Sequence, residues 1–286
     1  MNKNIYKLLS ILPDKAYIRL QYRYSTKRKL NLKNPTRYNE KLQWLKLYDH
    51  KPEYTTMVDK NLVKKYVADK IGEQYIIPTL GVWKDATDIK LEDLPEQFVL
   101  KCNHDSKSVF ICKNKAEFDF DAAKIQLNQG LKQNHFTYGR EWPYKNVNPV
   151  ILAEKYMEDE SGGLQDYKVM CFNGKPRLIQ LHQGRFTNKY THDIYDTNWN
   201  LQDFNQKGEI NADFPAEKPV FLEEMLQLSA ILSEGIPHVR VDWYYVEGQL
   251  YFGELTFFDA SGYLDFAPDE YNEIIGNWIE LPQINK

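Results

Sequence analysis

The spacing of apolar residues changes once along the chain. In residues 1–70 they recur at the three- and four-residue intervals of a helix, as at Val63 and Val67. From residue 76 onward they gather in short runs typical of strands, with one helical stretch near residues 121–133 between them. These runs are YIIPTLGVW, FVLKC, SVFICK, PVILAEKYM, DYKVMCF and RLIQLH. The pattern predicts an α-rich arm followed by an α+β body.

Turn signals divide the second half of the chain. Asn173-Gly174 separates two strand-like runs, and both residue types tolerate the positive φ of a type I′ hairpin turn. The stretch FLEEMLQLSAILSEG has the pattern of an amphipathic helix that Gly235 closes. A second hairpin follows in HVRVDWYYVEGQLYFGELTFF, and PDEYNEIIGNWI predicts a short final helix.

The second hairpin carries acidic residues on both of its strands. Arg240 and Asp242 alternate with apolar residues on the first strand, and Glu254 lies on the second. Two carboxylates on one face suit Mg²⁺, which prefers hard oxygen ligands and keeps several waters. The alternative interpretation is a set of exposed strand acids that pair with Arg240.

The loop of this hairpin decides whether the two acids share a face. A two-residue loop at Glu247-Gly248 would place Asp242 and Glu254 on opposite faces, because strand side chains alternate with period two. We therefore predict a three-residue loop that includes Val246, with a type I turn and a bulge at Gly248. This register places four polar residues on one face: Arg240, Asp242, Glu254 and Thr256.

Three further segments could hold a phosphate-bearing ligand. Lys101 ends the apolar run FVLKC, where burial without an anionic partner would be costly, and a phosphate is a good partner. The loop at residues 103–108 follows, and its backbone N–H groups could reach phosphate oxygens. EKYM, at residues 154–157, ends the run PVILA and precedes Gly162-Gly163 and Asp166. Taken alone, the loop has the composition of an ordinary surface turn, and EKYM that of a strand end.

Composition and motifs narrow the class of protein. A hydrophobic share of 42% with 27% charged residues excludes a disordered or fibrous chain, and the apolar runs are too short for a membrane-spanning helix. The N-terminal apolar stretch is too brief for a signal peptide, and the three cysteines show no CxxC spacing, so we expect a cytoplasmic protein. The histidines lack zinc-site spacing, and no P-loop, dinucleotide or nucleophile-elbow motif occurs. Any nucleotide site must therefore use another architecture.

One segment departs from an otherwise balanced charge. The whole chain has a net charge of −3, which gives no general attraction for nucleic acid. Residues 15–33 nevertheless contain only cations among their charged residues: Lys15, Arg19, Arg23, Lys27, Arg28, Lys29 and Lys33. Two interpretations remain open. The segment is either a solvated helix face and loop, or a patch that contacts a membrane surface, an anionic glycan or a partner such as polysaccharide-assembly machinery.

The order of lysine strand, loop, EKYM segment and late acidic hairpin resembles the ATP-grasp fold, as in D-alanine–D-alanine ligase. More closely, several blocks look like the TupA-like ATP-grasp family of cell-surface polysaccharide gene clusters. The blocks are TRYNEKLQWLKLY, VDKNLVKKYV, IGEQYIIP, LPEQFVLKCNH, DYKVMCFNGKP and VRVDWYYVEGQLYFGELTF, and they extend over roughly residues 35–282. Each block alone is a weak signal, and their shared order makes the resemblance specific.

The resemblance implies an α+β fold in which two subdomains grip ATP and the helical arm packs outside. The corresponding divisions are an arm at 1–70, a subdomain with the lysine strand and phosphate flap at 71–150, and a subdomain with the adenine hinge and Mg²⁺-binding hairpin at 151–286.

The same resemblance assigns the nucleotide contacts. Lys101 would hold the α- and β-phosphates, Lys155 would add a second phosphate contact, and Asp166 would accept hydrogen bonds from the ribose hydroxyls. The flap at 103–108 would cover the β- and γ-phosphates, and its candidate residues are Asn103, His104, Ser106 and Ser108. The residues near the adenine would be Glu154, Tyr156 and Met157.

The resemblance also assigns the reaction centre. Arg240 would stabilise the transferring phosphoryl group, and Asp242 and Glu254 would bind Mg²⁺. Thr256 stands where related enzymes often have an Asn metal ligand, so its hydroxyl or a water would take that place.

The flap also differs from the family pattern, because Asp105 and Lys107 stand where glycines are usual. Three interpretations follow: Asp105 turns away to cap the turn, the flap closes differently, or the activity has lapsed.

The implied activity is that of an ATP-dependent carboxylate–amine ligase with an acyl-phosphate intermediate. The family context suggests a uronic acid of a capsular glycan as the carboxylate and an amino compound as the nucleophile. Arg185 and Lys189 are candidates to grip the anionic acceptor, and a solvated loop is the alternative for their segment. Rival functions are a kinase that phosphorylates a glycan hydroxyl, a lapsed ATP-grasp scaffold that binds a partner, and a glycosyltransferase-like protein.

Overall fold

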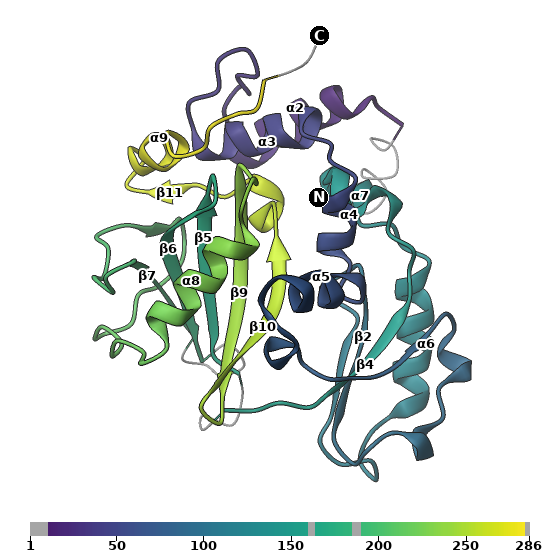
Figure 1. The fold of residues 1–286 in the computed structure, drawn as a ribbon. Coiled ribbons are helices and arrows are strands. Elements are labelled where there is room, and N and C mark those ends of the chain that lie inside the picture. The colour runs from purple at the N-terminus through teal and green to yellow at the C-terminus, as the bar shows by residue number, and fades with distance from the viewer. Residues whose placement is uncertain (1–10, 160–163, 185–189, 284–286) are drawn as a thin grey trace.

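The computed structural model of the protein describes residues 11–159, 164–184 and 190–283. Within these ranges the chain forms a helical arm and two lobes, each built on an antiparallel sheet (Figure 1). The arm contains the helices α2 (Asp14–Thr26), α3 (Tyr38–Tyr48), α4 (Glu53–Val58) and α5 (Leu62–Ile71).

The first lobe is built on the small sheet, whose strands are ordered β1-β4-β2-β3. Its strands are β1 (Thr79–Trp83), β2 (Phe98–Cys102), β3 (Val109–Cys112) and β4 (Ile151–Lys155). Along β2, Phe98, Leu100 and Cys102 are buried and pack with Leu127 of α6 (Phe120–Leu131) into the core of this lobe. Because side chains alternate along a strand, Lys101 lies on the face of the small sheet away from α6.

The second lobe is built on the large sheet, whose strands are ordered β10-β9-β5-β6-β7. Its strands are β5 (Asp166–Phe172), β6 (Lys175–Gln183), β7 (Thr191–Asp196), β9 (His238–Val246) and β10 (Gln249–Thr256). Helix α8 (Leu222–Leu232) covers one face, where Trp243 Nε1 donates a hydrogen bond to Ser229 Oγ at 2.9 Å. The even-numbered residues of β9 therefore lie on the face away from α8.

Short elements connect and close the two lobes. They are α7 (Phe136–Gly139), α9 (Tyr271–Gly276), a small pair of strands β8 (Asn205–Gln206) and β11 (Phe266–Ala267), and 3₁₀ turns at Glu73–Tyr75, Ala86–Asp88, Leu91–Asp93, Trp142–Asn146 and Asp259–Gly262. The predicted strands, the helices at α6 and α8 and the final helix all form. No apolar run predicted β7, because its sequence THDIYD is interrupted by polar residues.

The hairpin at Asn173-Gly174 forms as predicted, with both residues at positive φ. The predicted loop of the second hairpin is wrong. Val246 pairs directly with Gln249, so the loop has two residues, and Glu247 and Gly248 both have positive φ (50° and 84°). This combination is typical of a type I′ turn, which matches the twist of the strands better than a type I turn does.

A bulge at Gly253 changes the register beyond that turn. Phe252 pairs with Trp243, and the next pair is Glu254 with Asp242. Gly253 is the extra residue, and a side chain there would be crowded, because a Cβ would lie 3.1 Å from the backbone oxygen of Asp242. The predicted result, in which Asp242 and Glu254 share a face, is thus correct, although a different irregularity produces it.

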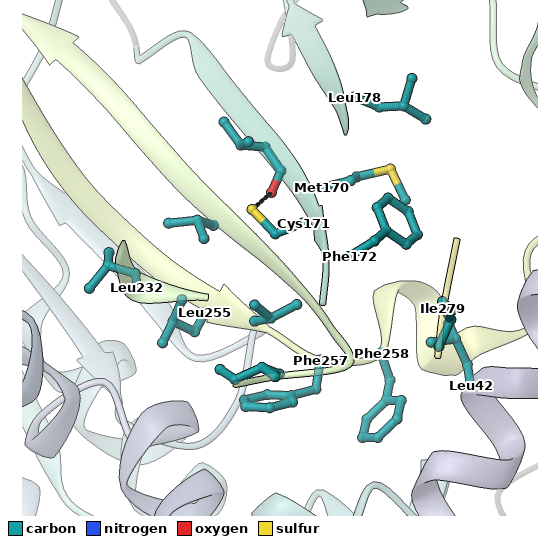
Figure 2. Close-up of a cluster of buried hydrophobic side chains, with 14 of the residues drawn as sticks. Leu42, Met170, Cys171, Phe172, Leu178, Leu232, Leu255, Phe257, Phe258 and Ile279 are labelled. Carbon is teal, nitrogen blue, oxygen red and sulfur yellow. Dashed lines mark hydrogen bonds between the residues drawn. The ribbon is translucent and has the colours of Figure 1, made fainter. Parts of the chain in front are cut away.

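The arm and the large sheet share one hydrophobic core, whereas the small sheet has its own. The largest cluster joins residues of α3 and α5 to residues of β5, β9, β10 and α8. Figure 2 draws part of it, including Leu42 of α3, Phe172 of β5 and Ile279 near the C-terminus. The N-terminal arm is therefore anchored to the C-terminal lobe.

Gly276 provides a test of this anchoring. It lies where α9 meets the loop before α3, and a Cβ there would overlap the backbone oxygen of Thr36 and lie 2.7 Å from the Tyr38 nitrogen. Backbone atoms cannot rotate away, so we expect Gly276→Ala to lower the free energy of unfolding by about 1–3 kcal/mol, as overpacking does. Urea denaturation measures this change. The exposed Glu273→Ala on the same helix is the control and should change it by less than about 0.5 kcal/mol; equal effects would contradict the tight contact.

Candidate functional site

A cavity of about 450 Å³ lies between the two sheets, and the arm also lines it. Lys101 and Glu154 face it from the small sheet, and Lys168 faces it from the large sheet. The arm contributes Lys60, from the turn between α4 and α5, and Lys64 of α5. The expectation that the arm packs outside the nucleotide-binding lobes is therefore wrong for α5, since this helix forms part of the cavity wall.

A buried carboxylate stands between two lysines at the small-sheet wall. Glu154 Oε2 lies 2.5 Å from Lys101 Nζ, and its Oε1 lies 2.7 Å from Lys64 Nζ. Burial alone would raise the pKa of Glu154, but the two ammonium groups together hold it below its ordinary value. Burial lowers the pKa of Lys64, against the opposing effect of Glu154. Lys101 thus has an anionic partner within the protein and still faces the cavity.

The loop at 103–108 is closed by its own aspartate. Asp105 Oδ1 accepts hydrogen bonds from the backbone N–H groups of Lys107 (3.2 Å) and Ser108 (3.0 Å), and its Oδ2 accepts one from Ser108 Oγ (2.7 Å). The capping part of the first interpretation is confirmed, but Asp105 does not turn away from the cavity, since it is one of the residues that line it. Lys60 Nζ also donates to the backbone oxygen of Asp105 at 2.9 Å, and this contact ties the loop to the arm.

The residues predicted in this loop divide into two groups. Ser106 lines the cavity beside Asp105, whereas Ser108 does not line it and its buried side chain donates to Asp105. The side chains of Asn103 and His104 are buried and hydrogen-bonded elsewhere: Asn103 Nδ2 donates to the Asn148 carbonyl (3.0 Å), and His104 Nε2 lies 3.0 Å from the Gln133 carbonyl. These two side chains hold the base of the loop, so a phosphate contact from them would have to come through the backbone.

One end of the cavity is apolar. Met157 packs with Ile77 and Val246 in a small hydrophobic cluster, and Leu164 lies against it. Met157, Ile77 and Leu164 line the cavity together with Tyr156, whose hydroxyl donates to Glu158 at 2.6 Å. This surface offers a slot for a flat, weakly polar group.

Two of the predicted binding residues flank the apolar end. Lys155 is exposed and lines the cavity, whereas Asp166 is buried and lies 3.5 Å from Lys168 Nζ.

A buried ionic cluster lies on the large sheet behind Lys168 and Glu254, which line the cavity, whereas Arg240 and Asp242 do not line it. Arg240 donates two hydrogen bonds to Asp242, from Nε to Oδ1 and from Nη2 to Oδ2, both at 2.7 Å. Lys168 Nζ donates to the same Asp242 Oδ2 at 2.6 Å. Burial would raise the pKa of Asp242, but these cations hold it well below its ordinary range. Arg240 Nη1 also lies 2.8 Å from Asp259 Oδ1.

Glu254 completes the polar face beside this cluster. Its Oε2 lies 3.5 Å from Lys60 Nζ, and its Oε1 accepts a hydrogen bond from Thr256 Oγ1 at 3.4 Å. Burial would raise the pKa of Glu254, but Lys60 and its cationic neighbours hold it below the ordinary value. Arg240, Asp242, Glu254 and Thr256 therefore lie on one face, as predicted.

The oxygen donors of this face are carboxylate and hydroxyl oxygens, the type of ligand that Mg²⁺ prefers. Mg²⁺ often takes only one or two protein carboxylates and completes its octahedron with waters and phosphates. Asp242 and Glu254 are cross-strand neighbours and would supply those carboxylates, with the Thr256 hydroxyl next to them. Both Asp242 oxygens are bound by Arg240 and Lys168, so Asp242 would have to exchange one of these contacts for the metal. Among the described residues, no group of three or more His, Cys, Asp or Glu forms a complete metal cage. The face therefore fits a metal shared with a phosphate ligand.

Sequence reasoning missed several charged residues of the site, among them Lys60, Lys64, Lys168 and Asp259. Lys60 and Lys64 lie in the block VDKNLVKKYV at a four-residue spacing, which suggested a shared helix face, although only Lys64 lies on α5. Lys168 precedes an apolar run, and a lysine buried there needs an anionic partner. This need was a signal that could have identified Lys168 as a residue of the site. Asp259 gave none, because it lies in a turn after β10 and meets Arg240 only in the folded chain. Arg185 and Lys189 lie outside the described residues.

Lysines outnumber carboxylates around the cavity. Six lysines line it (Lys60, Lys64, Lys101, Lys113, Lys155 and Lys168) against four carboxylates (Asp105, Glu154, Asp166 and Glu254), which leaves a formal charge of +2. A cationic cavity with one apolar end suits a ligand with several negative charges and a flat ring, as in a nucleoside polyphosphate.

A comparison of the sequence with protein families decides the relationship. The profile of the TupA-like ATP-grasp family matches residues 40–280. The chain belongs to this family. No match was found among curated proteins.

Solved structures similar to this TupA-like chain include ATP-grasp ligases, at low identity. D-alanine–D-alanine ligase from Bacillus anthracis in complex with ATP is 16% identical over 71% of this chain and 54% of the ligase, with a TM-score of 0.42. The enzyme of the same name from Helicobacter pylori is 16% identical over 86% and 69%, with a TM-score of 0.45. The ligase PsnB with its minimal precursor is 12% identical over 75% and 58%, with a TM-score of 0.42.

The TupA-like chain thus spans little more than half the length of the Bacillus anthracis ligase. At TM-scores below 0.5 these likenesses say nothing about the chemistry of this chain. Among the described residues, no helix has the length and apolar character needed to cross a membrane.

The ionic role of Glu154 can be tested through the pH dependence of the protein's stability. Because its folded pKa lies below the ordinary value of about 4.3, its ionised form contributes stability above that pH and loses it as pH falls through the folded pKa. We expect Glu154→Gln to be less stable than the wild type at pH 6, and the difference in free energy of unfolding to shrink steadily toward pH 3. Denaturant titrations at several pH values measure it. The exposed Glu92→Gln is the control, with a small and constant difference; a constant large difference for Glu154→Gln would contradict the ionic role.

Proposed function

We propose that this protein is an ATP-dependent carboxylate–amine ligase that works through an acyl phosphate. The observation that carries the proposal is the cavity, in which one apolar end and a row of lysines lead to Glu254 and to Lys168, the lysine that donates to Asp242 of the buried cluster. Membership of the TupA-like ATP-grasp family supports ATP as the ligand of this cavity.

In the proposed complex, adenine occupies the apolar end near Tyr156 and Met157, and Asp166 accepts hydrogen bonds from the ribose. The phosphates then extend toward Lys101 and Lys60. Both lysines already touch anionic or carbonyl oxygens, Glu154 and the Asp105 backbone, so their positions are set before the ligand arrives. This preorganisation lowers the cost of binding a polyanion.

Asp242, Glu254 and the hydroxyl of Thr256 would hold Mg²⁺ at the end of the phosphate chain. The metal would neutralise charge on the phosphate oxygens. Within the protein, Arg240 and Lys168 bind the carboxylate oxygens of Asp242. In the proposed complex their positive charge would stabilise the negative charge of the transferring group.

The proposed reaction has two steps, phosphoryl transfer to the acceptor carboxylate and displacement of phosphate by the amine. A carboxylate oxygen of the acceptor attacks the γ-phosphorus, the bond to the β-phosphate oxygen breaks, and ADP leaves. The amine nitrogen then attacks the acyl carbon, phosphate leaves, and the nitrogen loses a proton to form the amide. A uronic acid of a capsular or cell-surface glycan is the proposed acceptor, which rests on the resemblance to the family described above.

A kinase that phosphorylates a sugar hydroxyl would use the same cavity without an amine. A lapsed scaffold was suggested by the acid in the flap. That objection loses its force, because Asp105 binds the backbone of its own turn and its carboxylate is occupied there. The glycosyltransferase alternative draws no support from the family match, which is to an ATP-grasp family.

A coupled assay of ADP release tests the reaction. The protein is incubated with ATP and Mg²⁺, and a panel of uronic acids is crossed with a panel of amines. We expect ADP release that requires an acid and rises with an amine, together with a product whose mass equals acid plus amine minus water. ADP release with a phosphorylated product and no amine dependence would identify a kinase instead, and ADP release absent from every pair would contradict the ligase.

The metal face generates a second test. Two carboxylates and the ATP phosphates repel one another until a divalent cation lies between them, so ATP should raise the melting temperature with Mg²⁺ and little in EDTA. Glu254→Gln should reduce the Mg²⁺-dependent shift. Glu247→Gln, at the exposed tip of the same hairpin, is the matched control and should keep it. An equal ATP shift in EDTA would argue against the metal face.

A further inference from the structure

The outer face of α2 carries a row of cations. Lys15, Arg19 and Arg23 follow one another at four-residue intervals, which places them near one another along one side of the helix, and Lys27 follows at its C-cap, where its Nζ donates to the Tyr24 carbonyl at 2.9 Å. All four are exposed. Helix α2 lies at the top of Figure 1, and its opposite side packs into the core of the protein through residues such as Ile18 and Tyr22.

These cations have no counter-charge in the described part of the chain. None of the four forms an ion pair there, although Arg28 of the same segment pairs with Asp265 and Asp269. The acid of α2, Asp14, is engaged with Arg140 at 3.2 Å. Exposed Lys29 and Lys33 extend the cationic surface beyond the helix. The net charge of −3 for the whole chain makes this surface a local feature of the arm.

Two apolar side chains lie among these cations. Leu20 is 50% exposed and Tyr24 is 55% exposed, and they are neighbours on the helix at a four-residue spacing. A single exposed apolar residue is common on protein surfaces. Here the two lie directly beside Arg19 and Arg23, so the face combines basic and apolar groups in the manner of a helix that lies in a membrane interface.

We propose that the outer face of α2 docks the protein on the surface of an anionic lipid bilayer. The cations would meet the anionic headgroups, and Leu20 and Tyr24 would enter the boundary between headgroups and acyl chains. A nucleic acid or an anionic glycan would satisfy the cations but would offer no apolar phase for Leu20. The bilayer is therefore the partner that fits both kinds of side chain.

Vesicle co-sedimentation tests the docking. The full chain is mixed with vesicles of equal parts phosphatidylglycerol and phosphatidylcholine, and with vesicles of phosphatidylcholine alone. We expect binding to the anionic vesicles alone, and weaker binding at higher salt. Each basic residue near an anionic surface is worth about a fivefold change in partitioning, so Arg19→Glu with Arg23→Glu should weaken binding about 25-fold or more.

Two further double variants and a folding control complete the experiment. Lys84→Glu with Lys90→Glu makes the same charge change on exposed residues of the small-sheet lobe and should leave binding nearly unchanged. Leu20→Ala with Tyr24→Ala should weaken vesicle binding without changing the charge. An unchanged thermal shift with Mg-ATP shows that each variant is folded, since none of these residues lines the cavity.

Equal losses for the two charge-reversed pairs would overturn the proposal, because net charge alone would then explain the binding. Wild-type vesicle binding by Leu20→Ala with Tyr24→Ala, together with equally tight binding to a labelled DNA duplex, would also overturn it and identify a general polyanion surface. No binding to the anionic vesicles at low salt would overturn it directly.

Discussion

The arrangement of the polar face of the large sheet depends on how the protein accommodates Asp242, a carboxylate buried on β9. An isolated buried carboxylate would be costly, and Arg240 and Lys168 compensate it from neighbouring positions. Both cations are buried too, so each needs further anions: Asp259 serves Arg240, and Asp166 serves Lys168. One buried charge thus fixes side chains on two strands and on the turn after β10, because removal of any member leaves a neighbour without its counter-charge.

Charges of the two lobes meet through the arm. The backbone N–H of Lys60 donates to the Asn103 carbonyl, its ammonium group donates to the Asp105 carbonyl, and the same group lies 3.5 Å from Glu254. A single residue of the arm therefore touches the loop at 103–108 in one lobe and the acidic face of the other. A shift of this loop would change the surroundings of Glu254 through Lys60 alone.

Sequence reasoning predicted the features that depend on the local alternation of side chains along a strand. It failed for features that depend on contacts with distant segments of the chain. The alternation in β9 was sufficient to place Arg240 and Asp242 on one side, and the order of motifs was sufficient for the fold. The predicted three-residue loop at Glu247-Gly248 was wrong, because the bulge at Gly253, five residues away, brings Asp242 and Glu254 onto one face instead. Contacts such as Arg240 with Asp259 had no local signal, since the turn that presents Asp259 is held by buried hydrogen bonds from α3, about two hundred residues earlier.

The close contact between α3 and α9 has a consequence for how the chain is made. The backbone at Thr36 meets Gly276, so α3 completes its packing only after residues about 240 positions later in the chain have left the ribosome. At typical rates of synthesis this interval lasts roughly 10 to 50 s. During it, the apolar side of α2 and α3 has no final partner and is open to chaperones or to premature association. The lobe on the small sheet has a separate core and can fold in the meantime. During synthesis the small-sheet wall of the cavity therefore forms first, and the strands of the large sheet complete the cavity later.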